Sequence, residues 1–99
     1  MSRIYEVMYI VRPDVEEADL DKLIEGFEKN VTDGGGEVKS TEKMGRRRLA
    51  YEIAKRREGI YVLMNFESGP DVPLELDRVF RISDDVFRHM VVRQNEDEE

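Results

Sequence analysis

The sequence contains no cysteine and a single histidine, His89. These shortages exclude a disulfide framework, a cysteine nucleophile, a cysteine-ligated zinc site and every metal motif that needs two histidines. No apolar run approaches the ~18 residues of a membrane-spanning helix, and the N-terminus lacks the apolar stretch of a signal peptide. We therefore expect a soluble cytoplasmic protein with no metal, no cofactor and no membrane partner.

The 99 residues suffice for one domain with one core. Hydrophobic residues make up 39% of the chain, and charged residues also make up 39%, well above the ~25% that is typical of globular proteins. We predict a single domain over residues 1–93 and an acidic C-terminal tail over residues 94–99.

The hydrophobic pattern predicts four strands and two helices. The strands are expected at Arg3–Val11, Glu37–Ile53, 59–66 and Val86–Arg93. The helices are expected from residue 15 or 16 to 33 and over 73–80, with a charged turn at 55–58. Gly45 interrupts the second strand, and a glycine within a strand suggests a bulge.

This order, β-α-β-β-α-β, predicts an α+β, ferredoxin-like fold with a four-stranded antiparallel sheet and both helices on one face. The opposite sheet face would then lack helix cover, although the first and third strands carry apolar residues on both sides. An exposed apolar patch commonly marks a partner surface. We assign Met8, Ile10 and Met64 to that surface.

Charge is distributed unevenly along the chain, whose net charge is −7. Residues 42–57 hold seven basic and two acidic side chains, whereas the segments before and after them are net acidic. An overall acidic protein does not attract nucleic acid at long range, so any RNA contact should be local, with arginines paired to phosphates.

Three consecutive arginines, Arg46, Arg47 and Arg48, dominate the basic segment. On a strand they alternate between faces, so at least one should point to solvent or RNA. Protection of an edge strand is the alternative explanation, because charged side chains deter edge-to-edge pairing. Three further arginines could extend an RNA-binding patch: Arg3, Arg88 and Arg93.

Catalytic patterns are missing. His89 has no cysteine or evident serine partner, so a hydrogen-bonded sheet histidine is the favoured interpretation. The glycines at 34–36 end a helix and are not followed by the lysine of a phosphate-binding loop. Tyr61, with Tyr5 or Tyr9, could stack on bases, but a place in the core is favoured for these tyrosines.

Several segments together resemble the bacterial small-subunit ribosomal protein S6 family. The matching segments are residues 5–7, 12–14, 45–51, 61–65, 80–82 and 88–93, and the sequence Gly-Arg-Arg-Arg-Leu-Ala-Tyr at 45–51 is the most specific of them. The chain departs from the family at two positions. Met44 stands before this segment, where family members often have an aromatic residue, and Glu52 stands after it, where a proline is common.

The resemblance implies a non-catalytic protein that binds the central domain of small-subunit ribosomal RNA, not DNA, together with ribosomal protein S18. It also implies a ribosomal location. We assign the RNA contacts to the six arginines named above, as cations on phosphate. A ferredoxin-like enzyme resembling acylphosphatase is one alternative, which hydrolysis of a generic acyl phosphate would reveal. A self-associating sheet without RNA is another.

Overall fold

The computed structural model describes the backbone of residues 2–53 and 56–93. It describes the side chains of the same residues except Ala50, Ile53, Arg56, Val92 and Arg93. The elements are β1 (Arg3–Val11), α1 (Glu17–Asp33), β2 (Glu37–Ile53), β3 (Arg56–Ser68), α2 (Asp71–Ile82) and β4 (Val86–Arg93). The proposed acidic tail at 94–99 lies outside the described residues.

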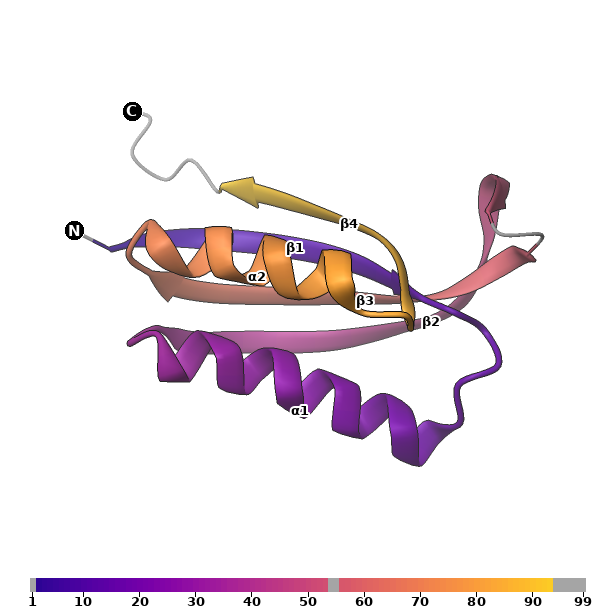
Figure 1. Ribbon diagram of the computed structural model, residues 1–99, viewed down its shortest axis with the longest axis horizontal. Coiled ribbons are helices and arrows are strands. Elements are labelled where there is room, and N and C mark those ends of the chain that lie inside the picture. Colours follow the sequence, from indigo (N-terminus) through magenta and orange to yellow (C-terminus); the bar gives the residue numbers. More distant parts are fainter. Residues whose placement is uncertain (1, 54–55, 94–99) are drawn as a thin grey trace.

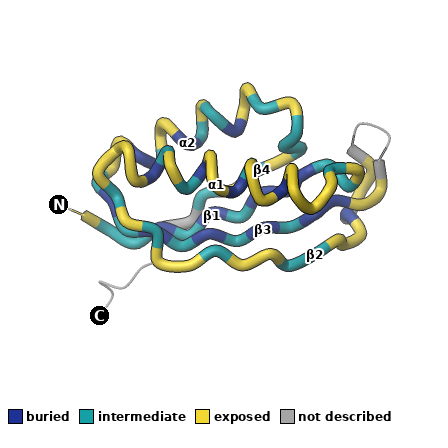
Figure 2. Tube along the Cα trace, turned by 90° about the horizontal axis from the view of Figure 1, so that it is seen from below, coloured by how far each residue is buried: buried dark blue, intermediate teal, exposed yellow. Residues whose placement is uncertain are grey.

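The four strands form one antiparallel sheet in the order β2-β3-β1-β4. Both helices cover the same face of this sheet (Figures 1 and 2). The fold is therefore the ferredoxin-like α+β arrangement that the element order predicts. The predicted bounds of β1, β2 and β4 are also confirmed.

The core lies between the helices and the covered sheet face. Directly paired residues of β1 and β3 share that face, including Val7 with Met64 and Tyr9 with Val62, and all four are fully buried. The ring of Tyr9 packs against Phe27 and Phe80, with centroid separations of 4.9 Å in both cases. Removal of this apolar surface from water is the main force that holds the helices on the sheet.

Tyr9 introduces a polar atom into this core. Its buried hydroxyl has no hydrogen-bond partner in the described structure. Burial, with a smaller effect from Glu28, raises the pKa of the Tyr9 phenol, so the group stays neutral.

Met64 does not lie where the sequence prediction placed it. It pairs with Val7, shares the helix-covered face and is fully buried, so it cannot form part of an exposed partner surface. The prediction was wrong because a central strand is apolar on both faces, and composition alone does not show which face the helices cover.

The third strand also starts earlier than predicted. β3 begins at Arg56, so residues 56–58 are part of a strand and not of the predicted charged turn. Here Arg48 pairs with Glu58 and Arg47 with Gly59. Both faces of this part of the hairpin carry exposed side chains, so strand pairing continues without the apolar alternation that would reveal it in the sequence.

Gly45 forms the predicted irregularity in β2. Its φ is +91°, and the register with β3 shifts between Lys43 and Gly45. Only glycine adopts such a backbone conformation without steric cost, and a bulge increases the local twist and bend of a strand. The bend lies just before the three arginines.

Candidate nucleic-acid interface

The hairpin of β2 and β3 extends beyond the rest of the sheet (Figure 1). β1 ends at Val11, which pairs with Ile60, so residues 56–59 of β3 have no paired residue in β1. We call residues 47–53 and 56–59 the arm. It leaves the body of the protein on the C-terminal side of Gly45 and carries most of the basic segment of the sequence.

Two of the three consecutive arginines lie on the arm and the third lies at its base. Arg46 pairs with Ile60 and therefore lies on the helix-covered side of the sheet, as Arg48 does, whereas Arg47 lies on the opposite side. The predicted alternation is thus confirmed. β2 is an edge strand, so these charges can also deter edge-to-edge pairing.

Two of the described arginines of the arm and its base donate hydrogen bonds to backbone carbonyls, and none of them forms an ion pair with a described carboxylate. Arg46 Nη2 donates to the Pro13 carbonyl oxygen at 2.7 Å, and Arg47 Nε donates to the Met44 carbonyl oxygen at 3.4 Å. Within residues 2–53 and 56–93, no ion pair is formed by Arg46, Arg47, Arg48 or Arg57. Their guanidinium groups retain donors for phosphate oxygens.

Arg88 is brought to the arm by the tertiary structure. It lies on β4, opposite Ile10, on the sheet face that the helices leave open. Its Nη1 donates to the hydroxyl of Tyr51 on the arm, and its guanidinium carbon lies 5.7 Å from the centroid of the Tyr51 ring. The predicted extension of the basic patch towards Arg88 is therefore compatible with the geometry.

Arg3 and Arg93 lie at the other end of the sheet. β1 starts at Arg3 and β4 ends at Arg93, whereas the arm extends beyond the opposite end of β1. The side chain of Arg93 lies outside the described residues. The structure thus brings four of the six predicted RNA-binding arginines together at the arm, and it does not bring these two to the same place.

Tyr51 was not singled out in the sequence. Its ring is 57% exposed although it continues the apolar alternation of the strand. Tyr5 and Tyr9 are buried, which confirms their predicted place in the core. For Tyr61 that prediction was wrong, because its side chain is half-buried on the open face. The sequence signals for Tyr51 are its position three residues after the arginines and its place at the end of segment 45–51, the most specific part of the family resemblance.

The open face also carries the remaining predicted partner residues. Met8 is half-buried there, and Met90 is 46% exposed. Ile10 is only 6% exposed, and together with Leu49 and Tyr51 of the arm it lines a hollow on this face. Of the three predicted partner residues, Met8 keeps accessible surface, whereas the prediction was wrong for Ile10 as it was for Met64, because both side chains are buried.

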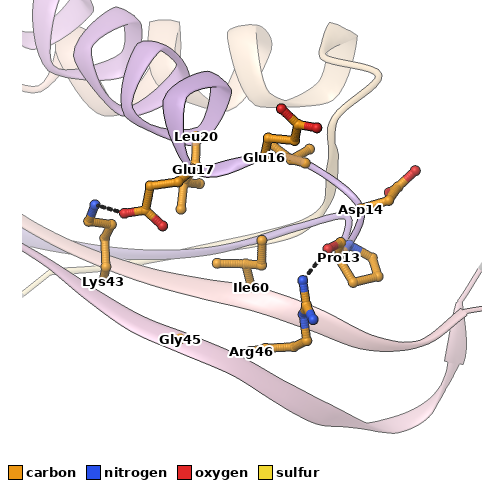
Figure 3. Close-up of a pocket in the computed structure, with 10 residues that line it drawn as sticks. Pro13, Asp14, Glu16, Glu17, Leu20, Lys43, Gly45, Arg46 and Ile60 are labelled. Carbon is orange, nitrogen blue, oxygen red and sulfur yellow. Dashed lines mark hydrogen bonds and ion pairs between the residues drawn. The ribbon is translucent and has the colours of Figure 1, made fainter.

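A hollow of about 500 Å³ separates the start of α1 from β2 (Figure 3). Lys43 enters it and forms ion pairs with Glu17 and Asp21, each at 2.8 Å. Hydrogen bonds and charge from these two carboxylates raise the pKa of Lys43, so the ammonium group is charged but neutralised. The hollow therefore offers a phosphate less positive charge than its lysine and arginine suggest.

This hollow does not support the acylphosphatase-like alternative. Such an enzyme would need an arginine and an asparagine that converge on a phosphate-binding loop, and no asparagine lines the hollow. Arg12, in the loop before α1, instead binds the carboxylates of Asp85 at 2.6 Å and Asp14 at 3.0 Å. Among the described residues, no cluster of side chains could hold a metal ion.

His89 has the structural role that the sequence favoured. Its Nε2 lies 2.6 Å from Asp77 Oδ1, and its ring packs against Phe80 with centroids 5.0 Å apart. The hydrogen bond from His89, followed by the charge of Arg81, lowers the pKa of Asp77. The pair links α2 to β4.

No helix in the described part of the chain is long and apolar enough to cross a membrane.

Comparison with known proteins confirms the resemblance of the sequence. Residues 4–93 match the family described as Ribosomal protein S6. The small ribosomal subunit protein bS6 of Desulforamulus reducens is 53% identical over 94 residues, which cover 95% of this chain and 99% of that protein. The bS6 protein of Clostridium acetobutylicum is 49% identical over 88 residues, or 89% and 93% of the two chains.

Solved structures agree with this result. The crystal structure of 30S ribosomal protein S6 from Thermotoga maritima has a TM-score of 0.88 and 33% identity, over 95% of this chain and 89% of that one. An Arabidopsis thaliana protein with a TM-score of 0.53 and 10% identity shares the fold alone. The present chain belongs to the ribosomal protein S6 family, whose members are structural, non-enzymatic proteins of the small ribosomal subunit.

Proposed function

We propose that the protein is a structural constituent of the small ribosomal subunit, in the bacterial cytoplasm, and binds the central domain of the ribosomal RNA together with ribosomal protein S18. The observation that carries this proposal is the arm, which extends from an acidic body and bears arginines without carboxylate partners among the described residues. Membership of the S6 family supports the same function.

The RNA contacts are assigned to Arg46, Arg47, Arg48 and Arg88, as cations on phosphate oxygens. Guanidinium groups bind phosphates through two parallel hydrogen bonds, which position a protein on RNA without reading its sequence. The net charge of −7 opposes association at a distance. Binding should therefore be weak for the isolated protein and should depend on a partner that supplies further positive charge.

The open sheet face is the proposed docking surface for S18. Met8 and Leu63 are paired there, and the same face carries Glu6, Glu42 and Glu67. An apolar strip flanked by carboxylates suits a basic protein partner, because opposite charges orient the two surfaces and speed their encounter. Met64 has no part in this contact because it is fully buried on the other face.

The test measures binding to a transcript of the ribosomal RNA central domain, with and without S18, over a range of salt concentrations. One triple variant replaces Arg46, Arg47 and Arg48 by alanine. The control replaces three exposed, ion-paired cations of the helices: Lys29, Arg78 and Arg81. Both variants carry the same change in net charge.

With S18 present, we expect the arm variant to bind at least tenfold more weakly than the control. Its slope of log affinity against log salt should also be shallower, by about 0.7–0.9 for each phosphate that is no longer bound. Circular dichroism would verify that both variants are folded. Equal decreases in affinity in the two variants would show that net charge matters and that the arm does not, and binding by neither variant nor wild type would contradict the proposed function.

A further inference from the structure

Tyr51 separates two hollows of different chemistry at the base of the arm. The first, of about 150 Å³, lies on the open sheet face and is lined by apolar side chains, namely Met8, Ile10, Leu49, Tyr61 and Met90. The second lies on the arm and is lined by Arg48 and Arg57 together with Leu49 and Glu52. Tyr51 and Leu49 line both, so an apolar surface and a cationic surface are directly adjacent.

The Tyr51 ring is also paired with a cation. Arg88 donates a hydrogen bond to the Tyr51 hydroxyl and places its guanidinium group within cation–π range of the ring. No carboxylate among the described residues forms an ion pair with Arg88. We call Tyr51 and Arg88 the Tyr51 platform.

The geometry points to a binding site for one unpaired nucleotide of single-stranded RNA. We propose that the base stacks on the Tyr51 platform in the apolar hollow, while its phosphate binds Arg48 and Arg57 in the adjacent hollow. This inference rests on the proposed function. It adds a base contact to a protein whose other proposed contacts are all to phosphate.

Charge favours RNA over a protein segment as the occupant of this site. The acidic side chains Glu6 and Glu67 of the open face lie towards the other end of β1, whereas the charged side chains that line the two hollows beside Tyr51 are three arginines, Arg48, Arg57 and Arg88, and one carboxylate, Glu52. An aromatic ring beside guanidinium groups is the combination that binds unpaired bases, since the π-face stacks on the base and the cations bind the backbone. A basic partner protein would be repelled here.

The experiment uses the full chain with S18 and the central-domain transcript. Tyr51→Leu removes the ring but keeps an apolar side chain, Tyr51→Phe keeps the ring, and Arg48→Ala removes a proposed phosphate contact. We expect Tyr51→Leu to weaken RNA binding roughly 5- to 150-fold, the range for removal of one base–aromatic stack. Tyr51→Phe should retain most of the affinity.

Salt dependence separates stacking from phosphate binding. Tyr51→Leu should leave the slope of log affinity against log salt unchanged, because stacking releases no counterions, whereas Arg48→Ala should make the slope shallower by about 0.7. A uridine decamer that contains one 2-aminopurine gives an independent measurement. Its fluorescence should be quenched by the wild type and by Tyr51→Phe, but not by Tyr51→Leu.

Three results would overturn the inference. Unchanged RNA affinity in Tyr51→Leu would exclude the stack, and because the wild type would still bind the transcript, the proposed function would survive. A shallower salt slope in Tyr51→Leu would indicate displaced arginines and not the removal of a stack. Weaker binding of Tyr51→Leu to S18 without RNA, measured by calorimetry, would assign the apolar hollow to the protein partner.

Discussion

The cations of the body and those of the arm have different surroundings. In the body, the described lysines and arginines within ion-pair distance of a carboxylate include Arg12, Lys29, Lys39, Lys43, Arg78 and Arg81. On the arm and at its base, no described carboxylate forms an ion pair with the side chain of Arg46, Arg47, Arg48 or Arg57. Proximity to carboxylates, and not the number of basic residues, therefore determines which cations a polyanion can bind.

The two regions also differ in what they bury. The body holds the aromatic cluster of Tyr9, Phe27 and Phe80, whereas most described arm side chains are exposed. Leu49 is the apolar exception on the arm, at 7% exposure. We infer that the body provides the stability of the fold and that the arm is available for binding. The following substitutions test this division.

The largest loss of stability is expected for Phe80→Ala. Phe80 is 1% exposed and contacts both Tyr9 and Phe27, so its removal leaves a cavity between α2 and the sheet. We expect the free energy of unfolding to fall by about 3–5 kcal/mol, as measured by denaturant unfolding. Leu74→Ala, at a 70% exposed position of the same helix, is the control and should change it by less than about 0.5 kcal/mol.

Gly59→Ala tests the junction of the two regions. A Cβ atom at Gly59 would overlap the Cγ2 atom of Ile10, so either β1 or the arm must shift. We expect a loss of about 1–3 kcal/mol in the free energy of unfolding, the usual cost of overpacking. Gly69→Ala is the control, because a Cβ there meets nothing within 4 Å. Equal stability of the two variants would mean that the arm is not held closely against β1.

Tyr9→Phe should increase the free energy of unfolding, in contrast to Phe80→Ala and Gly59→Ala. It removes the buried hydroxyl that has no described partner and keeps the ring contacts with Phe27 and Phe80. We expect the free energy of unfolding to rise by about 1 kcal/mol, because an unsatisfied buried group no longer has to be desolvated. Tyr5→Phe, whose ring keeps 8% exposure, is the control. A clear loss of stability in Tyr9→Phe would reveal a partner for the hydroxyl.

The smallest effect is expected for Asp77→Asn, whose loss of stability should be present near neutral pH and disappear in acid. His89 and Arg81 lower the pKa of Asp77 in the folded protein. The stability that this carboxylate contributes is therefore present above its unfolded pKa of about 4 and is lost as the pH falls through the lower folded value. Unfolding measured between pH 6 and pH 2 should show a weaker dependence on pH in Asp77→Asn than in wild type.

Asp71→Asn is the matched control for that experiment, because Asp71 lies on the same helix and forms no ion pair with a described residue. Its acid dependence should follow that of the wild type. If Asp77→Asn also followed the wild type, the link between α2 and β4 through His89 would contribute nothing measurable.

Much of the fold could be predicted because local periodicity reflects burial. Tyr5, Val7, Tyr9 and Val11 alternate along β1 and all are buried. The same reasoning failed where burial does not alternate: β3 begins three residues earlier than predicted, and Met64 lies on the covered face of a strand that is apolar on both sides.

The candidate site was predicted less completely. The arginines at 46–48 were singled out because they are consecutive in the chain, and Arg88 was included only as a possible extension. Tyr51, which belongs to the site proposed above, was not singled out because an exposed tyrosine and a buried one look alike in an alternating strand. Its exposure depends on how far the arm extends beyond β1, which no local pattern encodes.

The sequence by itself determined the order of the elements, the buried face of β1 and the concentration of positive charge at 42–57, because each depends on neighbours along the chain. Only the tertiary structure decided which cations are neutralised and which side chains meet. Lys43 pairs with Glu17, Arg12 with Asp85 and Arg88 with Tyr51. Such contacts join residues that are distant in sequence, and electrostatic and packing forces act through space and not along the chain.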